Sequence, residues 1–284
     1  MTIETPPSAD ARRDAAAALT AVPVDLWAED LRWRHPVDLW ADLAPIYPQV
    51  DSRRLLEDGA DDGWRFLLPG DPQWPAVLTC DLRPGPVGLW VHGFGDLAVL
   101  ADRSVTITGS RTSTGYGTQV AADLAAALAP RWVDRPVTVA AAGTGDGVDA
   151  AALRAAAATG TAIAVLATTS ELTGENEDLF EEITTRGGLV VCVTAPGTAR
   201  HGVHALARAR TLAVLTRGTV LVESPPHGGA WETACTAWRY RRRVMAVPGP
   251  ITAALSEGPH RLLAEGTARM VTGPDDIRTH LDRT

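Results

Sequence analysis

Residues 106–117 read TITGSRTSTGYG, a β-branched run that breaks into glycine, serine and a single arginine. The alanine-rich segment TQVAADLAAALA follows at 118–129 and has the apolar spacing of a helix. The pattern predicts a buried strand, a glycine-rich turn and a helix in direct succession. Glycines allow a sharp turn close to a ligand, and the N–H groups that begin a helix favour an anion. The stretch therefore indicates a phosphate site, with a hydroxyl from Ser110 and a guanidinium from Arg111.

From residue 104 onward, short apolar runs alternate with helical ones. The apolar runs are SVTIT, PVTVAA, TAIAVLA, GLVVCVT, GTVLVES and RVMAVPG. The helical runs between them cover 118–129, 148–158, 176–187, 203–216 and 229–242. Such alternation predicts parallel strands joined by crossover helices, and strands that are apolar throughout predict burial on both faces. We expect an α/β protein with a doubly wound, mostly parallel sheet.

The first 62 residues differ from the rest in composition. They hold thirteen Asp or Glu against six Arg, and so carry nearly all of the net charge of −8. Leu, Trp and Ala recur there at helical spacing, interrupted by prolines. We expect an acidic helical module over 1–62 and the main core over 63–284. Trp27, Trp33 and Trp40 are expected to pack inside that module.

The bulk properties place the chain in the class of folded proteins without membrane spans. It has 284 residues, 45% of them apolar, but no apolar run of about 18 residues. Its start, MTIETPPSAD, is acidic where a secretory signal would be basic and then apolar. We therefore expect a cytoplasmic protein. Cys80, Cys192 and Cys235 lack CxxC spacing, so we predict no disulfide or zinc site, no metal, and three buried cysteine side chains.

A second glycine-rich turn, AGTGDGVD at 142–149, lies between the next apolar run and the next helical run. Doubly wound sheets bind ligands beyond the carboxyl ends of their strands, where such turns lead into helices. Gly143, Gly145 and Gly147 are therefore expected at the same phosphate site. Tight packing alone is the alternative for either turn, and a favourable contact with the helix dipole is the alternative for Asp149. Neither turn spells GxGxxG, which argues against a redox dinucleotide.

Several motifs in a fixed order carry a resemblance to a known family. They are GSRTSTGYG at 109–117, AAGTGDGVDAAALRAA at 141–156, the segment from ARARTLAVLT to VMAVPGP at 207–250, and SEGPHRLLAEGTARMVTGPDDI at 256–277. In this order and spacing the chain resembles the DNA-processing protein A family (DprA, also called Smf) from about residue 70 to 277. The resemblance implies an extended Rossmann-like core without catalytic chemistry or cofactor. It also implies binding of single-stranded DNA, homodimers, and the loading of a RecA-type recombinase during natural transformation.

The family motifs also imply which residues bind DNA. The G-[ST]-R loop matches 109–111, the R-N-R signature matches 208–210 with Ala209 at its centre, and the S-G-[AS]-x-x-T-A signature matches the segment from 228. The implied DNA- and phosphate-binding residues are Gly109, Ser110, Arg111, Gly143, Gly145, Gly147, Arg208, Arg210, Gly228, Gly229 and Thr233. The chain departs from the family at Leu153, where a histidine is usual. We also expect it to lack the C-terminal winged helix of many members.

Two alternatives belong to other classes of function. Nucleotide phosphoribohydrolases of the lysine-decarboxylase-like type have a similar core and a P-G-G-x-G-T-x-x-E signature, which PPHGGAWETA at 225–234 matches only in part. Hydrolysis would need a carboxylate at the sugar, for which Glu223 and Glu232 are the candidates. A nucleotide sensor without enzymatic activity is the other alternative.

Two tryptophans lie seven residues apart in the helical run at 229–242, beside a cluster of arginines. Trp231 and Trp238 offer one face on which bases could stack, next to Arg239 and the arginines of 241–243. The alternative is that Trp238 packs inward and the arginines form a solvated helix end.

Overall fold

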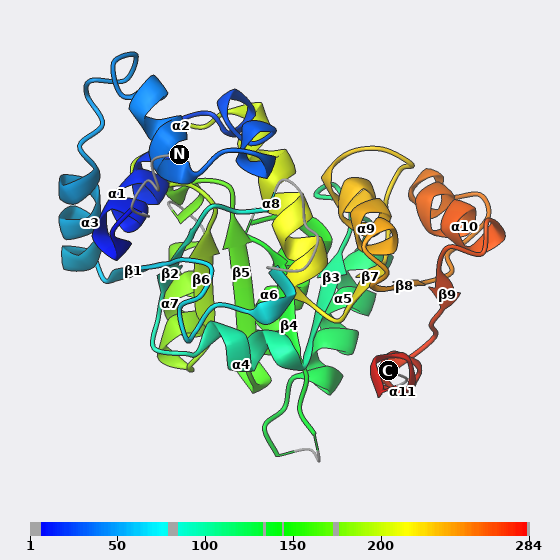
Figure 1. Cartoon of the computed structure of the whole chain (residues 1–284). Helices are drawn as coiled ribbons and strands as arrows, with labels where there is room; N and C mark the ends of the chain where they lie inside the picture. Colours follow the sequence, from blue (N-terminus) through cyan, green and yellow to red (C-terminus); the bar gives the residue numbers. More distant parts are fainter. Residues whose placement is uncertain (1–6, 79–84, 133–134, 144, 173–175, 283–284) are drawn as a thin grey trace.

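The computed structural model describes residues 7–78, 85–132, 135–143, 145–172 and 176–282. Within them, nine strands form one sheet in the order β1-β2-β6-β5-β4-β3-β7-β8-β9 (Figure 1). The strands are β1 (Trp64–Leu67), β2 (Leu89–His92), β3 (Ser104–Thr108), β4 (Thr138–Ala142), β5 (Ala162–Leu166), β6 (Leu189–Cys192), β7 (Gly218–Leu221), β8 (Arg243–Ala246) and β9 (Arg269–Met270). All pairs from β6 to β9 are parallel, whereas β1 and β2 pair antiparallel at one edge. The predicted mostly parallel α/β sheet is confirmed.

The helices form layers on both faces of the sheet. They are α1 (Ala9–Thr20), α2 (Pro36–Leu43), α3 (Ser52–Asp61), α4 (Leu97–Asp102), α5 (Gly115–Leu128), α6 (Gly147–Thr159), α7 (Glu177–Thr185), α8 (Gly202–Leu215), α9 (Gly229–Arg239), α10 (Glu257–Ala264) and α11 (Pro274–Asp282). Helices α5, α6 and α7 share one apolar cluster with the sheet, and α4 and α8 share the other (Figure 1). On β4, Val139 and Ala141 belong to the first cluster and Ala140 and Ala142 to the second. The central strands are thus buried on both faces, as their continuous apolar runs predict.

The six predicted strands of the core and the five helices between them are all present within a few residues of their expected bounds. The chain reverses direction across the sheet at β3, which lies between β4 and β7. Ligands of doubly wound sheets bind where the strand order reverses in this way. None of the described helices has the length and apolarity to cross a membrane.

The N-terminal helices pack on the antiparallel edge of the sheet. Leu19 of α1 is fully buried in the same apolar cluster as Trp90 of β2. The indole Nε1 of Trp90 donates to Thr20 Oγ1 at 2.9 Å, and the N–H of Ala195 donates to the Thr20 carbonyl at 3.0 Å. These contacts join α1 to β2 and to the segment that follows β6. The predicted division into a module over 1–62 and a core over 63–284 remains a prediction.

The cysteine and tryptophan predictions are met in part. Cys192 is buried and Cys235 is half-buried, while Cys80 lies outside the described residues. In the N-terminal segment Trp27 is buried and Trp40 half-buried, also in contact with the main core. The expectation that Trp33 packs inside was wrong, because it follows the short 3₁₀ turn Asp30–Arg32 and is 84% exposed.

Candidate functional site

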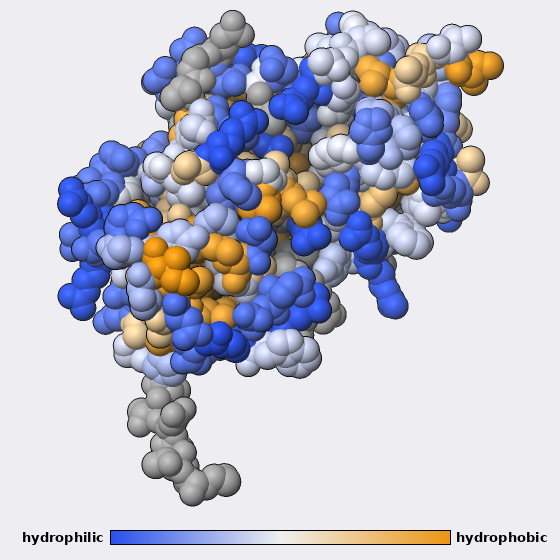
Figure 2. Space-filling model, turned by 90° about the horizontal axis from the view of Figure 1, so that it is seen from above, coloured by the Kyte–Doolittle hydropathy of each residue, from blue (hydrophilic) through white to orange (hydrophobic). Residues whose placement is uncertain are grey.

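A groove of about 940 Å³ opens at the carboxyl ends of the parallel strands. It lies between the turns after β3 and β4 and the beginnings of α8 and α9, and we call it the carboxyl-edge groove. The helices α8 and α9 both begin beside it, so that N–H groups at two helix starts lie near one hollow. Figure 2 looks onto the molecule from above, where hydrophilic side chains surround small apolar patches.

The two glycine-rich turns are in direct contact, and glycine makes this contact possible. Gly147 has φ +66°, and a Cβ there would lie 2.1 Å from the carbonyl oxygen of Ser110. The N–H of Val148 donates to that same oxygen at 3.2 Å. A Cβ at Gly109 would lie 2.6 Å from the carbonyl oxygen of Glu223. The turns after β3, β4 and β7 therefore meet at contact distances that a side chain would prevent.

Asp149 holds the ends of β3 and β4 together. Its carboxylate accepts hydrogen bonds from Thr108 Oγ1 at 3.1 Å, from the N–H of Gly109 at 3.2 Å and from the N–H of Ala142 at 3.0 Å. Burial raises the pKa of Asp149 to about 6, although the N–H donors of Ala142 and Gly109 act in the opposite direction. Because its partners lie on neighbouring strands, the carboxylate does more than interact with its own helix dipole.

This buried carboxyl group predicts a pH dependence of stability. The folded-state pKa of about 6 lies above the unfolded value of about 3.9, so the native state binds the proton more tightly. The resulting stabilisation is complete below the unfolded pKa and is lost as the pH rises through the folded pKa. The free energy of unfolding of the parent, compared with that of Asp149→Asn, should therefore fall by about 1 to 3 kcal/mol between pH 4 and 7. Urea unfolding of both proteins across this pH range measures the difference. A difference that does not change with pH would contradict the prediction.

The carboxylates that a nucleotide hydrolase would need are occupied by structural contacts. Glu223 is buried, and it accepts hydrogen bonds from the N–H of Thr114 at 2.8 Å and from its Oγ1 at 2.7 Å. Glu232 accepts from Thr236 Oγ1 at 3.1 Å and pairs with Arg239 at 3.2 Å. Neither side chain lines the groove. Their contacts stabilise the turn before α5 and the exposed side of α9.

The structure brings most of the predicted binding residues to one groove. The predicted residues that line it are Gly109, Ser110, Arg111, Gly147, Arg208, Gly228, Gly229 and Thr233. Gly143 and Gly145 belong to the same turn but do not line the groove. A Cβ at Gly143 would lie 2.2 Å from a methyl carbon of Leu166, and one at Gly145 would lie 2.0 Å from the amide nitrogen of Asn176. Packing accounts for Gly143, and the backbone angle φ of +86° accounts for Gly145.

The arginines of the groove differ in their availability. Arg111 is exposed, and its guanidinium takes part in no hydrogen bond or ion pair among the described residues. Arg208 is nearly buried, at 11% side-chain exposure, and pairs with Glu171 at 3.0 Å, whose side chain is 9% exposed. Arg111 can therefore meet a ligand directly, whereas Arg208 is already neutralised.

Arg210 does not reach the groove. It lies two residues after Arg208 on α8. Helical residues two positions apart point in directions that differ by about 200° around the helix axis. It lines a separate pocket beside Trp27 and His204, at the contact of α8 with the N-terminal segment. The structure thus separates the two arginines that the family signature groups together.

The groove also contains residues that the sequence motifs missed. Arg200, His201 and His227 line it and belong to the loops before α8 and α9. Only Arg200 had a signal in the sequence, because no Asp or Glu occurs between Glu182 and Glu223 while five arginines do. Local charge points to this segment, but only the fold shows which of its arginines face the groove.

Comparison with known proteins identifies the family. A model of the family described as DNA recombination-mediator protein A matches residues 65–282. The chain belongs to this family. A putative DNA processing protein DprA of Mycobacterium tuberculosis is 37% identical over 248 residues, which cover 80% of this chain and 61% of that protein. The DprA of Streptococcus pneumoniae is 31% identical over 234 residues, 81% of this chain and 78% of that one.

Solved structures of the family agree with the fold. The crystal structure of DprA from Streptococcus pneumoniae matches with a TM-score of 0.75 and 25% identity, covering 96% of both chains. DprA from Helicobacter pylori matches with a TM-score of 0.63 at 20% identity, over 77% of this chain and 95% of that one, and shows the shared fold alone. The chain spans about three fifths of the length of the Mycobacterium tuberculosis relatives.

Proposed function

We propose that the carboxyl-edge groove binds the phosphate backbone of single-stranded DNA. The observation that carries the proposal is the exposed guanidinium of Arg111 on the glycine-rich turn after β3, which has no hydrogen bond or ion pair among the described residues. A planar guanidinium next to helix N-termini suits phosphate oxygens. The related Helicobacter pylori protein is described as having a single-stranded DNA binding mode.

The surroundings of Arg111 favour single-stranded DNA over a small cofactor as the ligand. Elsewhere in the groove, Gly228 has φ +87° and Gly229 begins α9, and a Cβ at either position would have no atom within 4 Å. This leaves the backbone N–H groups of that turn accessible to a ligand. Arg200 adds a second exposed cation. Two exposed cations and two helix starts along the groove allow contacts to more than one phosphate of a DNA chain.

Replacing Arg111 by alanine tests the proposal. Arg111→Ala should weaken binding of a labelled single-stranded oligonucleotide by about 1 to 3 kcal/mol, the range for a charge-assisted contact. The thermal transition should hardly change, because the guanidinium has no hydrogen bond or ion pair in the part of the chain that the structure describes. Arg210→Ala is the matched comparison, since it removes an arginine of the same predicted set that lies outside the groove. Equal affinity of Arg111→Ala and the parent would remove Arg111 from the site.

The salt dependence of binding distinguishes a single DNA strand from a mononucleotide as the ligand of the groove. Each phosphate contact to a single strand contributes about −0.7 to the slope of log affinity against log salt concentration. A groove with two or three contacts should therefore give a slope of roughly −1.4 to −2 for an oligonucleotide. Complete displacement of the strand by a nucleoside monophosphate, or release of free base from it, would favour the nucleotide enzyme instead. We propose a binding function without catalysis.

Two further parts of the proposed function concern partners. We propose that the protein forms a homodimer and loads a RecA-type recombinase onto the bound strand in the cytoplasm, as the family resemblance implies. Sedimentation of the full chain tests the dimer. Recombinase filament formation on DNA with and without the protein tests the loading step.

A further inference from the structure

We propose that the amino-terminal edge of the sheet is a second surface for single-stranded nucleic acid. It lies at the end of the strands opposite to the carboxyl-edge groove, so the proposal goes beyond the function assigned to that groove. An arginine stands at or just before the start of each of five neighbouring parallel strands, β4, β3, β7, β8 and β9. The amino-edge surface is formed by Arg103, Arg135, Arg217, Arg241, Arg243 and Arg269.

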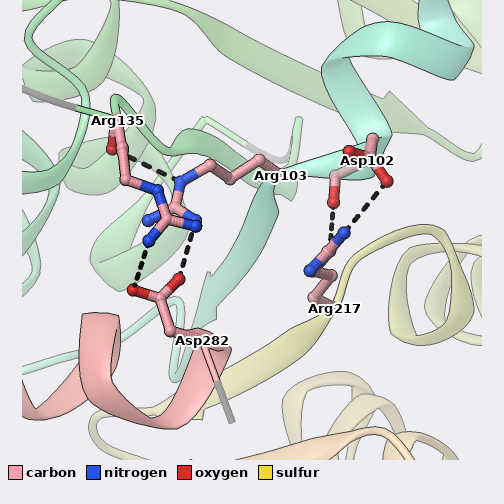
Figure 3. A network of polar contacts seen from close by, with 5 residues as sticks. All are labelled: Asp102, Arg103, Arg135, Arg217 and Asp282. Carbon is pink, nitrogen blue, oxygen red and sulfur yellow. Dashed lines mark hydrogen bonds and ion pairs between the residues drawn. The ribbon is translucent and has the colours of Figure 1, made fainter. Parts of the chain in front are cut away.

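Part of this surface is a network of ion pairs (Figure 3). Asp282 of α11 accepts from Arg103 at 2.7 Å and from Arg135 at 3.2 Å, and the hydrogen bond from Arg103 lowers the pKa of the Asp282 carboxyl. Arg217 pairs with Asp102 at 3.1 Å. Two carboxylates thus hold three arginines in place, and the six arginines of the surface outnumber these two carboxylates. A polyanion is the ligand that such an excess favours.

Two hollows lie beside the arginines of this surface. A hollow of about 460 Å³ is lined by Arg217, Arg241 and Arg243. A second hollow, of about 500 Å³, is lined by Arg243 and Arg269 together with His280. Arg243 belongs to both, so the two hollows are neighbours. Arg241, Arg243 and Arg269 are exposed, and successive phosphates of one strand could contact them in turn.

Arg241 has a backbone conformation that side chains rarely adopt. The N–H of Arg242 donates to the carbonyl of Ala237 and that of Arg241 to the carbonyl of Trp238, which forms the two-bond ending of α9 that usually requires glycine in the left-handed position. Arg241 occupies that position at φ +57°. Among the described residues, Arg135 at φ +68° is the other non-glycine residue with positive φ, and it belongs to the same surface. Strain retained at two such positions points to function.

An exposed tryptophan makes the surface suitable for single strands in particular. Trp238 lies in the last turn of α9, three residues before Arg241, and is 54% exposed. The alternative that Trp238 packs inward is therefore wrong. Trp231 lies differently, with the Arg261 guanidinium 5.7 Å from its ring centre. Aromatic side chains beside cations bind single strands by stacking on unpaired bases, which a duplex does not offer.

A stoichiometry experiment on the full chain tests the inference. The probe is a labelled oligothymidine of about eight nucleotides at low salt, short enough to occupy one site. We expect two bound per chain for the parent and one for Arg241→Gly/Arg269→Ala, with the groove site unaffected. The control Arg53→Ala/Arg54→Ala removes two exposed arginines from α3 and should still bind two. Arg241→Gly alone should raise the thermal transition temperature while weakening the second site, a combination that a structural role would not produce.

Further variants and competing ligands show which part of the inference an unexpected result would overturn. Trp238→Ala should weaken the second site about tenfold, and Trp238→Phe should largely retain it. A single site in the parent, abolished by Arg111→Ala alone, would overturn the inference and leave the proposed function intact. Absence of any oligonucleotide binding would overturn both. Displacement from the second site by duplex or by anionic vesicles as readily as by oligothymidine would overturn the assignment to single strands.

Discussion

Replacing Trp90 by alanine is expected to lower the free energy of unfolding by about 3 to 5 kcal/mol, the range for large aromatic residues in a core. Trp90 is fully buried on β2, and its ring lies 4.7 Å from that of Phe66, centre to centre. It also packs against Gly59 of α3, where a Cβ would lie 2.5 Å from a ring carbon. With its hydrogen bond to Thr20, this one side chain contacts the sheet and two N-terminal helices. Its removal leaves a cavity where these elements meet.

Thr20→Val separates the hydrogen bond from the packing. It keeps the volume of the side chain but leaves the buried indole N–H without its acceptor, so it should cost about 1 to 3 kcal/mol. Urea unfolding followed by far-ultraviolet circular dichroism measures both variants. We expect one cooperative transition in the parent, because α1 shares its apolar cluster with the sheet. A loss below about 1 kcal/mol for Trp90→Ala, or a separate early transition, would instead favour an independent N-terminal module.

Much of the core could be predicted because its signals are local. Strand β4 is apolar on both faces, so its burial was visible in a few consecutive residues. The glycine-rich turns were equally visible, because a contact as close as that of Gly147 with the Ser110 carbonyl requires glycine. The alternation of such units then predicted the parallel sheet and the edge of the sheet that holds the groove.

The unpredicted features depend on residues far apart in the sequence. Gly143 looked like a ligand-binding glycine, and only its contact with Leu166 shows that packing requires it. Arg208 and Arg210 look equivalent in the sequence, but the rotation of α8 turns one toward the groove and the other toward the N-terminal segment. The pairing of Arg208 with Glu171 joins positions 37 residues apart and carries no local pattern.

That buried pair leads to the second large prediction. Glu171→Ala should lower the free energy of unfolding by about 3 to 5 kcal/mol, because it leaves the nearly buried Arg208 without its counter-charge. It also removes the acceptor of the Ala167 N–H, which the Glu171 carboxylate binds at 2.8 Å. Arg208→Ala should cost a similar amount, since it leaves the buried carboxylate without its counter-charge. The double variant should recover part of the loss, as expected for two groups that interact directly.

The same two variants should differ in their effect on DNA binding. Both side chains line the carboxyl-edge groove, so without Glu171 the guanidinium of Arg208 is left for a phosphate to neutralise. At a temperature where Glu171→Ala is folded, oligonucleotide affinity should rise roughly tenfold, and the salt slope should steepen by about 0.7 for one added contact. Arg208→Ala, equally destabilised, should show no such gain. If DNA affinity falls together with stability in both variants, Glu171 positions the wall of the groove. If affinity rises in Glu171→Ala alone, the Glu171 carboxylate competes with DNA phosphate for Arg208.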